Sequence, residues 1–468
     1  MHILDYFFQP KSIAIIGASK NPIAWGNWVS QSALGYKEKR NVYLINPKTE
    51  KILGEKTYPS LSAIDDQVDF AAIILPTKKV PTALEECLEN GVKVATIITA
   101  GYAETEEGRP LQDELEKISK RGIRLQGPNC NGFYNVAMGI NVSAIPNKFL
   151  RDSPVAFVTQ SGYIGHALSL WGGARNFSFG KYISVGNEAD LTITDYLEYF
   201  SNDPTVKVIV LYIEGLKDGK RFFKVAKNAI QKRPIIVWKT GETKAVARAA
   251  SSHTGKIVGS KSIFDGVAKQ IGFIQITEPE HILPLSQALI KHPALNGKRI
   301  GVMTIGAGFA VILTNAISNN GFIVPEFSDA VKTKLRKVIK EYRASIKNPI
   351  DIGAAGDYDL NTIIKPMKIL FNENAVDAIV MANIGENELV FEEAGLMENY
   401  LAKQIQQLEQ KYERPILLYT IISEFESKSV KKISKRGPVY HSVSEVVTVL
   451  KGLYQFRQNE LKFLKLIE

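Results

Sequence analysis

The chain has 468 residues, of which 45% are hydrophobic and 23% charged, with 35 glycines and 20 prolines. This globular composition excludes a disordered or collagen-like chain, and the length predicts roughly three domains. Apolar stretches such as Val208 to Ile213 are far shorter than the ~20 residues of a membrane-spanning helix, so we expect a soluble protein that does not bind membranes. The N-terminus shows no basic segment and no small-residue cleavage site, so no export signal is predicted.

The net charge of +10 is compatible with nucleic acid, a membrane surface or an anionic small molecule as partner. Basic residues are spread along the chain, and the densest cluster, Lys431 to Arg436, contains no aromatic residues. A solvated surface is therefore favoured over a nucleic-acid site. The two cysteines, Cys87 and Cys130, are too few for a disulfide framework and lack metal-ligand spacing, which predicts a cytoplasmic protein without a metal site.

Short, continuous apolar runs alternate with amphipathic helical stretches in three successive series. The predicted strands are 12–16, 41–45, 70–75, 94–98 and 123–125, then 155–159, 182–185, 206–213 and 234–239, then 299–304, 378–382 and 415–420. Such runs are typical of parallel strands covered by helices on both faces. The sequence therefore predicts an α/β protein of doubly wound parallel sheets, with domains over residues 1–140, 141–294 and 295–468.

The second and third series resemble each other in sequence. Residues 155–162 align with 300–307, residues 207–215 with 377–385, and residues 233–238 with 414–419, in the same order. Insertions between two copies of one fold produce this pattern. Only the first copy continues into a loop with a histidine, Ala249-Ala-Ser-Ser-His-Thr-Gly255.

The first predicted strand runs into a glycine-containing turn, residues 17–26, before a predicted helix. Glycine lets the backbone approach a phosphate, and the amides at a helix start attract anions, although a plain tight turn fits equally well. The turn lacks the Gly-x-Gly-x-x-Gly spacing, which argues against a nicotinamide-dependent oxidoreductase. Candidate ligand residues follow the other strands at the same sheet edge: Asn46, Pro47, Lys48, Pro76, Thr99 and Ala100.

A second candidate anion site follows the first strand of the second series. Ser161 and Gly162 lie between a buried strand and an amphipathic helix, where a hydroxyl and free amides are available. Gly306 and Gly308 occupy the equivalent place in the third series. The two helix starts could face one phosphoryl group, or each could be a structural strand-to-helix turn.

His253, in Ser251-Ser-His-Thr-Gly255, is the one of six histidines with an informative neighbourhood. The loop by itself fits a capping or buried hydrogen-bonded histidine as well as a chemical one. A metal site is less favoured, because no second His or Cys lies at ligand spacing. A neutral imidazole is also a nucleophile toward phosphorus when a carboxylate fixes its tautomer, and Glu214 is the candidate partner.

Together these residues resemble the α subunit of NDP-forming acyl-CoA synthetases, the ADP-forming acetyl-CoA synthetase family, which is related to succinyl-CoA synthetase. The matching stretches span nearly the whole chain and are 16–19, 46–47, 97–101, 127–130, 160–162, 184–190, 239–241, 252–255 and 348–351. The Gly-Pro-Asn-Cys and Ser-His-Thr-Gly motifs among them are specific. The resemblance implies a Rossmann-like CoA-binding domain followed by two flavodoxin-like ligase domains.

The resemblance further implies an acid–thiol ligase that interconverts a carboxylic acid, CoA and ATP with acyl-CoA, ADP and phosphate. An acyl phosphate and a phosphohistidine at His253 would be the intermediates, with Glu214 orienting the histidine. Ser161, Gly162, Asn129, Gly306 and Gly308 are the residues implied for phosphate binding. Those implied for CoA are Gly17, Ser19, Lys20, Asn46, Pro47, Lys48, Pro76, Thr99, Ala100 and Cys130, with Cys130 interpreted as a small buried residue and not a nucleophile. Glu188 and Asp190 are expected to shape the acid pocket.

No stretch resembles the ATP-grasp domains that bind nucleotide in this family. The resemblance therefore implies a separate β subunit, in an α2β2 assembly, or a fused domain that binds ATP or ADP with Mg²⁺. The loop 304–309 is less glycine-rich than the family pattern, which weakens the prediction of a second phosphate-facing helix. Two alternatives stay open: a catalytically silent CoA-binding regulatory or scaffold protein, and a nicotinamide-dependent oxidoreductase. The sequence leaves open the acid, the physiological direction, and ADP versus GDP.

Overall fold

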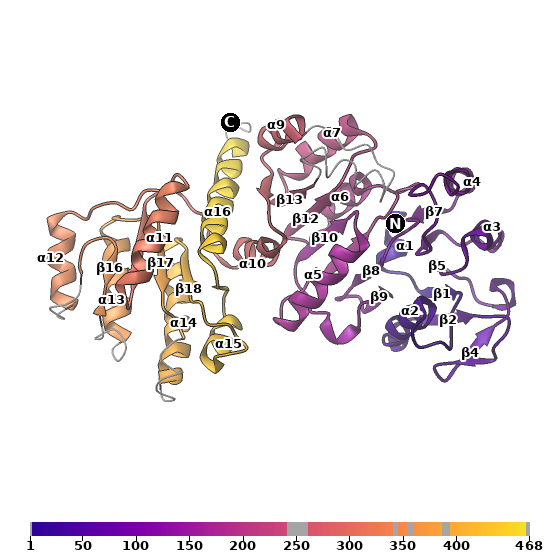
Figure 1. The fold of residues 1–468 in the computed structure, drawn as a ribbon, viewed down its shortest axis with the longest axis horizontal. Coiled ribbons are helices and arrows are strands. Elements are labelled where there is room, and N and C mark those ends of the chain that lie inside the picture. Colours follow the sequence, from indigo (N-terminus) through magenta and orange to yellow (C-terminus); the bar gives the residue numbers. More distant parts are fainter. Residues whose placement is uncertain (1, 241–260, 340–344, 354–359, 386–393, 465–468) are drawn as a thin grey trace. The chain divides into compact units, whose positions relative to one another are not determined.

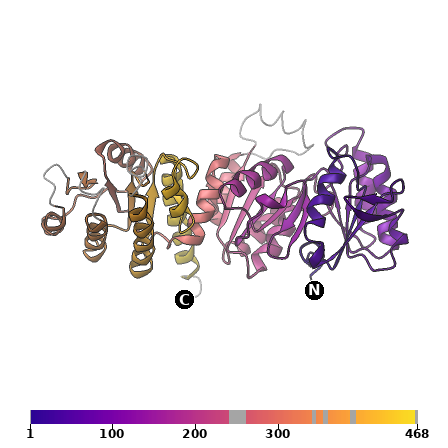
Figure 2. The same cartoon turned by 90° about the horizontal axis from the view of Figure 1, so that it is seen from below.

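The computed structural model describes residues 2–240, 261–339, 345–353, 360–385 and 394–464, and the chain divides into two compact units, Met1–Pro279 and Glu280–Glu468. The first unit contains two sheets and the second contains one. Helices lie on both faces of each sheet (Figure 1 and Figure 2). This arrangement explains the continuous apolar strand sequences, because both sides of each strand are buried.

The first sheet has the Rossmann strand order. Its strands are β1 (Ser12–Ile16), β2 (Asn41–Ile45), β3 (Lys51–Ile52), β4 (Glu55–Tyr58), β5 (Phe70–Ile73), β6 (Val94–Ile97) and β7 (Arg124–Gln126). They lie in the order β3-β4-β2-β1-β5-β6-β7, with β3 alone antiparallel, so the parallel strands follow the 3-2-1-4-5-6 order. The helices of this region are α1 (Asp5–Phe8), α2 (Trp25–Leu34), α3 (Val80–Glu89) and α4 (Arg109–Ser119).

The second sheet has the flavodoxin-like order, extended by an antiparallel hairpin. Its strands are β8 (Gly132–Asn135), β9 (Ile140–Ser143), β10 (Val155–Thr159), β11 (Lys181–Ser184), β12 (Val208–Ile213), β13 (Ile235–Lys239) and β14 (Ile274–Ile276). The order β14-β13-β12-β10-β11-β8-β9 places the parallel strands in the 2-1-3-4-5 arrangement. Its helices are α5 (Gly162–Ala174), α6 (Ile193–Asn202), α7 (Gly219–Ala229) and α9 (Lys261–Ile271).

The third sheet repeats the strand order of the second, which confirms the internal duplication. Its strands are β15 (Ile300–Thr304), β16 (Ile350–Asp351), β17 (Ala378–Ala382), β18 (Ile416–Tyr419) and β19 (Val439–Tyr440), in the order β16-β15-β17-β18-β19. The helices are α10 (Ile282–Lys291), α11 (Ala307–Asn319), α12 (Asp329–Val338), α13 (Leu360–Asn372), α14 (Ala394–Tyr412), α15 (Lys428–Ser434) and α16 (Val443–Leu464). Short 3₁₀ helices are η1 (Lys37–Lys39), η2 (Leu61–Ala63), η3 (Thr77–Lys79), η4 (Asn147–Phe149) and η5 (Pro279–His281).

The β8–β9 hairpin spans the predicted domain boundary at residue 140. It belongs to the second sheet, because β8 pairs antiparallel with β11. The N-terminal helix α1 then joins the first two sheets through aromatic contacts. The ring of Phe7 lies 5.7 Å from that of Phe70 in the first sheet and 5.8 Å from that of Phe133 in the second. These buried aromatic contacts hold the two sheets together in one compact unit.

The lengths and hydropathies of the helices were compared with those of membrane-spanning helices. Within the described segments, none is both long enough and apolar enough to cross a bilayer.

Candidate active site

The carboxyl edge of the second sheet brings two predicted site residues to the same point. Ser161 caps α5 directly after β10, and its hydroxyl accepts a hydrogen bond from the Ile164 amide at 3.4 Å. Glu214 follows β12, which is the parallel neighbour of β10. This pair of strands is the switch point of a flavodoxin-like sheet, where the chain connections diverge and ligands bind.

The buried side chain of Gln160 clamps the Glu214 loop onto the start of α5. Its carbonyl oxygen accepts hydrogen bonds from the amides of Glu214 (2.5 Å) and Gly215 (3.0 Å). Its amide nitrogen donates to the Gly215 carbonyl (2.7 Å) and to Oε2 of Glu188 (2.9 Å). All four polar directions of the Gln160 amide are thereby used, which sets the position of Glu214 relative to Ser161.

The carboxylate of Glu214 has an unsatisfied oxygen. Its Oε2 is buried and has no hydrogen-bond partner in the part of the chain that the structure describes. Behind it, the Lys239 ammonium donates to the Glu214 carbonyl at 2.9 Å. Because a buried carboxylate oxygen without a donor is costly, this atom is suited to receive an N–H or O–H from outside the described residues.

A cavity of about 930 Å³ opens beside these residues within the first unit. It brings together the following predicted site residues: Thr99, Ala100, Asn129, Cys130, Ser161, Gly162 and Glu214. Most of the remaining wall is apolar or aromatic and includes Trp25, Trp28, Phe149, Tyr163 and Leu170. A cavity of this size with a few convergent polar groups is typical of small-molecule and cofactor sites.

The loop after β7 closes one side of the cavity. Gly127 has φ +94°, and a Cβ there would lie 2.5 Å from the Ile97 carbonyl, so glycine is required. The Cys130 thiol donates to the same carbonyl at 3.3 Å, and burial raises its pKa to about 12. The thiol is therefore protonated at neutral pH, which agrees with the interpretation of Cys130 as a packing residue.

Glu188 and Asp190 do not line this cavity, and the expectation that they shape an acid pocket stays a prediction. Glu188 is 1% exposed, and its carboxylate binds Gln160 and the Ile193 amide (2.7 Å). Asp190 forms a bidentate ion pair with Arg124, with contacts of 2.8 and 3.0 Å. Each carboxylate thus has a partner distant in sequence, and Glu188 has a second partner nearby, Ile193.

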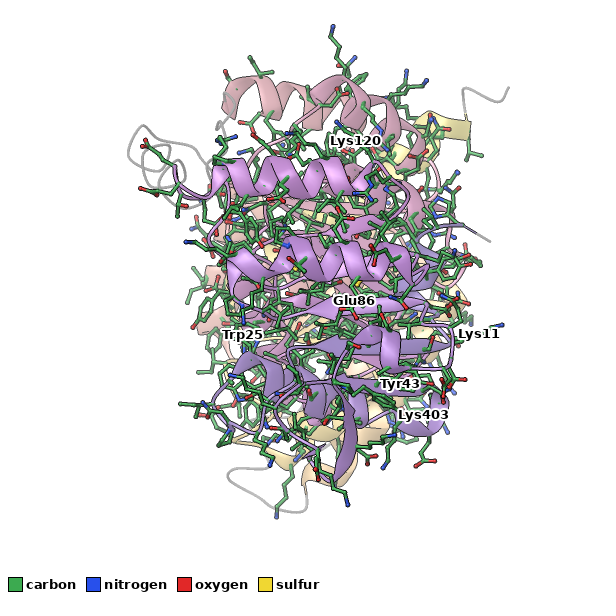
Figure 3. The ribbon with its side chains drawn as sticks, turned by 90° about the vertical axis from the view of Figure 1, so that its right-hand side faces the viewer. Lys11, Trp25, Tyr43, Glu86, Lys120 and Lys403 are labelled. Carbon is green, nitrogen blue, oxygen red and sulfur yellow. The ribbon has the colours of Figure 1, made fainter. Side chains whose placement is uncertain are left out.

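The other residues predicted for CoA lie at the carboxyl edge of the first sheet but outside the cavity lining: Gly17, Ser19, Lys20, Asn46, Pro47, Lys48 and Pro76. A Cβ at Gly17, where φ is +98°, would lie 2.1 Å from the Ile74 carbonyl. The Asn46 amide donates to the Ala18 carbonyl at 2.8 Å and ties the two loops together. Figure 3 shows Trp25, at the start of α2, and Lys11, which precedes β1, at opposite ends of the strands of this sheet.

Comparison with known proteins places this chain in a family. A family model described as "CoA binding domain" matches residues 11–135, and one described as "Succinyl-CoA ligase like flavodoxin domain" matches residues 152–289. The chain is 34% identical to the α subunit of ADP-forming acetate–CoA ligase II from Pyrococcus furiosus, over 98% of each chain. The chain belongs to the ADP-forming acetyl-CoA synthetase family.

Other members of the ADP-forming acetyl-CoA synthetase family support the assignment. ADP-forming acetate–CoA ligase from Methanocaldococcus jannaschii is 37% identical over 75% of this chain, but the match spans only 49% of that relative. A solved structure, dinucleotide-forming acetyl-coenzyme A synthetase 1 from Ca. Korarchaeum cryptofilum in complex with phosphate and ADP, superposes with a TM-score of 0.86 at 30% identity. That superposition covers 99% of both chains.

Three residues predicted from the synthetase family pattern stay untested by this geometry. His253 lies outside the described residues. Gly306 and Gly308 lie at the start of α11, in the second compact unit. The two glycines are surrounded by open space, since a Cβ at either position would meet nothing within 4 Å.

Sequence reasoning missed several residues of this synthetase cavity, above all His166. Tyr163, three residues before His166, and Leu170, four residues after it, also line the cavity. Residues at this spacing share one face of a helix, so one face of α5 lines the cavity. Spacing of three and four residues along a predicted helix could have grouped them. Nothing in the sequence, however, indicates which face of α5 borders the cavity.

Proposed function

We propose that this chain is the CoA-binding, phosphohistidine-carrying part of an ADP-forming acyl-CoA synthetase. The reaction interconverts a carboxylic acid, CoA and ATP with acyl-CoA, ADP and phosphate. Support comes from an α subunit of the same length at 34% identity and from a synthetase structure that superposes over the full chain.

The observation that carries the proposal is the pairing of Ser161 and Gly162 with Glu214 in one cavity. The first turn of α5 provides amide groups and a positive helix end for a phosphoryl group. The unpartnered Oε2 of Glu214 fits an imidazole N–H, which would fix the tautomer of His253 and leave its other nitrogen as the nucleophile.

In the direction of acyl-CoA synthesis, His253 would pass its phosphoryl group to the carboxylate of the acid. The N–P bond breaks as an O–P bond forms, which gives an acyl phosphate. The CoA sulfur then forms a C–S bond to the acyl carbon while the C–O bond to phosphate breaks. Asn129 and the start of α5 would hold the phosphate, and the apolar walls would shield the anhydride from water.

CoA fits the carboxyl edge of the first sheet. Gly17 lets the backbone approach a pyrophosphate, and Lys20 and Lys48 are exposed cations at the same edge. Thr99 and Ala100 belong both to this edge and to the cavity, so they mark a path for the thiol-bearing arm. Ser19, Asn46, Pro47 and Pro76 complete the proposed CoA loops.

A partner would supply the nucleotide site. The chain spans 98% of an α subunit but about half of a single-chain relative, so an ATP-grasp β subunit or fused domain remains to be provided. ATP or ADP with Mg²⁺ would bind there, and Gly306 and Gly308 would offer a second helix start to the phosphoryl group. We propose an α2β2 assembly in the cytoplasm, where the two free cysteines are compatible with reducing conditions.

Intact-mass spectrometry at neutral to alkaline pH tests the proposal. The purified chain is incubated with acetyl-CoA, phosphate and Mg²⁺, beside His253→Ala as control. A gain of one phosphate, about 80 Da, that the variant lacks supports the phosphoryl-carrier function. No gain across a panel of acyl-CoA esters, with CoA binding verified by calorimetry, would favour the catalytically silent CoA-binding protein.

A further inference from the structure

The imidazole of His166 is a cavity group to which the proposed phosphoryl chemistry gives no role. His166 lies on α5, is half-buried and lines the same cavity as Ser161 and Glu214. Among the described residues, none forms a hydrogen bond or ion pair with its ring. A half-buried imidazole that lines a cavity and lacks a partner is available to a ligand.

The helix directs this side chain toward the reacting end of the cavity. His166 follows Gly162 by four residues, which is about one turn of α-helix. Side chains on a helix lean toward its N-terminus and cover the preceding turn. The imidazole therefore lies over the first turn of α5, where Gly162 and Tyr163 begin the proposed phosphate site.

The surroundings keep this imidazole uncharged. Burial lowers the pKa of His166, so the ring is neutral at pH 7 and can accept a proton. The other titratable cavity residues are Cys130, whose thiol is held protonated, Tyr163 and the carboxylate of Glu214. The elements packed against α5 add the exposed Lys148 on η4 and two residues on β11, Lys181 and Tyr182. Lys181 is paired with Asp203, and burial holds Tyr182 protonated.

We propose that His166 is the general base that takes the proton of the CoA thiol in the thioester-forming step. This inference rests on the proposed function. The need is chemical, because an alkyl thiol is mostly protonated at neutral pH, as a free cysteine with its pKa of about 8.5 is, and only the thiolate is a strong nucleophile. A positioned base typically contributes about 10²- to 10⁴-fold to such a step.

The step balances without a further reactant. A ring nitrogen of neutral His166 takes the thiol proton, and the sulfur forms a C–S bond to the acyl carbon of the acyl phosphate. The C–O bond to the phosphoryl group breaks, and the departing phosphate takes the proton from the imidazolium. The products are acyl-CoA, hydrogen phosphate and neutral His166, and the reverse reaction uses the same transfers.

Two reactions of one substrate, an acyl phosphate, distinguish a base for the CoA thiol from a residue that only packs or binds phosphate. With an acyl phosphate, the full chain is assayed for thioester formation with CoA and, without CoA, for phosphorylation of His253 by intact mass. His166→Gln keeps a polar side chain but cannot take the proton. We expect thioester formation to fall about 100-fold while phosphorylation of His253 stays within threefold of the wild type.

Leu170→Gln is the matched control, because Leu170 lies one turn further along the same face of α5 and also borders the cavity. It introduces the same amide without removing a base, so it should alter both reactions to the same extent. Equal losses in both reactions of His166→Gln, or no loss in either, would overturn the proposal. Failure of wild-type protein to phosphorylate His253 would instead count against the proposed function.

A second measurement varies the ionisation of the thiol. As the pH rises, a growing fraction of the CoA thiol is already ionised in solution and needs no base. The ratio of wild-type to His166→Gln thioester rates should therefore shrink from about 100-fold at pH 7 to a few-fold at pH 9.5. A ratio that stays constant over this range contradicts a base and assigns His166 a packing role.

Discussion

The two flavodoxin-like sheets share one strand order but differ at their carboxyl edges. The register pairs Val158 with Leu211 in the first copy and Met303 with Met381 in the second. Counting on by one residue aligns Thr159 with Thr304 and Tyr212 with Ala382, and this fixes the residues that follow. The first-copy residues and their counterparts are Gln160 and Ile305, Ser161 and Gly306, and Glu214 and Ile384. Each polar side chain of the first copy is thus replaced by an aliphatic residue or by glycine.

This difference separates the two copies at the positions where we place the Glu214 part of the proposed chemistry. Ile384 is 2% exposed and packs in the core of the second unit together with Ile305, so neither can orient an imidazole. In the first copy, Gln160 and Glu214 are held in a hydrogen-bond network that faces a cavity. In the proposed mechanism the duplicated sheet is therefore a scaffold, and the two copies differ at a few positions after its strands.

The largest expected effect comes from Glu214→Gln, which keeps the shape of the side chain but removes its charge. Without the carboxylate, the imidazole of His253 would lose the group that fixes its tautomer and stabilises its positive form. We expect phosphorylation of His253 to slow by about 10²- to 10⁴-fold, measured by intact mass over time.

The control for this variant is Ile384→Val at the matching position of the second copy. It should leave the phosphorylation rate within twofold. A rate for Glu214→Gln within threefold of the wild type would show that Glu214 does not act on the histidine.

Gln160→Ile tests the clamp by installing the residue of the second copy. It removes four hydrogen bonds and leaves the amides of Glu214 and Gly215 without their partner. We expect a loss of about 2–4 kcal/mol in unfolding free energy, measured by denaturant unfolding, and phosphorylation at least tenfold slower.

Gln160→Glu serves as a second comparison, because it retains an oxygen for the two amides but sets another oxygen against Glu188 and the Gly215 carbonyl, to which the amide nitrogen donates. Its loss of stability should be no smaller than that of a single buried hydrogen bond. Unchanged stability in both variants would mean that the loop is held by its backbone alone.

The sequence predicts the fold well where strands are long and buried on both faces. The residue ranges of β1, β2, β10 and β17 are confirmed without change, whereas short edge strands such as β16 and β19 are absent from the prediction. Two-residue strands carry no periodic signal, and they exist because a neighbouring strand offers hydrogen bonds. Edge strands therefore depend on tertiary contacts that local sequence does not encode.

Site residues are predictable when they follow a buried strand. Ser161 and Glu214 were identified in this way, and the cavity contains both. The contacts of Glu188 and Asp190 were not predictable, because their partners, Gln160 and Arg124, lie far away in sequence. His166 escaped notice because only the packing of α5 decides which helix face borders the cavity.

The two copies should also differ in how their stability responds when a glycine near the start of α5 or of α11 is replaced by alanine. A Cβ at Gly165 would lie 2.3 Å from Cε2 of the buried Tyr182, whereas a Cβ at Gly308 would meet nothing. We expect Gly165→Ala to lower the unfolding free energy by about 1–3 kcal/mol through overpacking. Gly308→Ala should raise it by about 0.4–1 kcal/mol, because alanine restricts the unfolded chain. Thermal or denaturant unfolding of both variants checks the signs, and equal shifts would contradict the packing difference.

The smallest expected effect concerns an ion pair at the carboxyl edge of the second copy. His441 Nε2 lies 3.3 Å from Oε2 of Glu424, and its side chain is 27% exposed. Burial alone would lower the pKa of His441, but the hydrogen bond and charge of Glu424 outweigh it and the pKa is raised. The folded protein therefore binds this proton more tightly than the unfolded chain does.

The pair should contribute its full stability below about pH 6.5, the ordinary histidine pKa, and lose it as the pH rises through the elevated value. Because the histidine is partly exposed, we expect less than about 1 kcal/mol. Denaturant unfolding gives the difference in unfolding free energy between wild type and Glu424→Gln at pH 5.5 and at pH 8.5. We expect this difference to be larger at pH 5.5. Any effect of the substitution that does not depend on pH cancels when the two differences are subtracted. A difference that is equal at both pH values, or larger at pH 8.5, would mean that Glu424 acts on something other than the protonated imidazole.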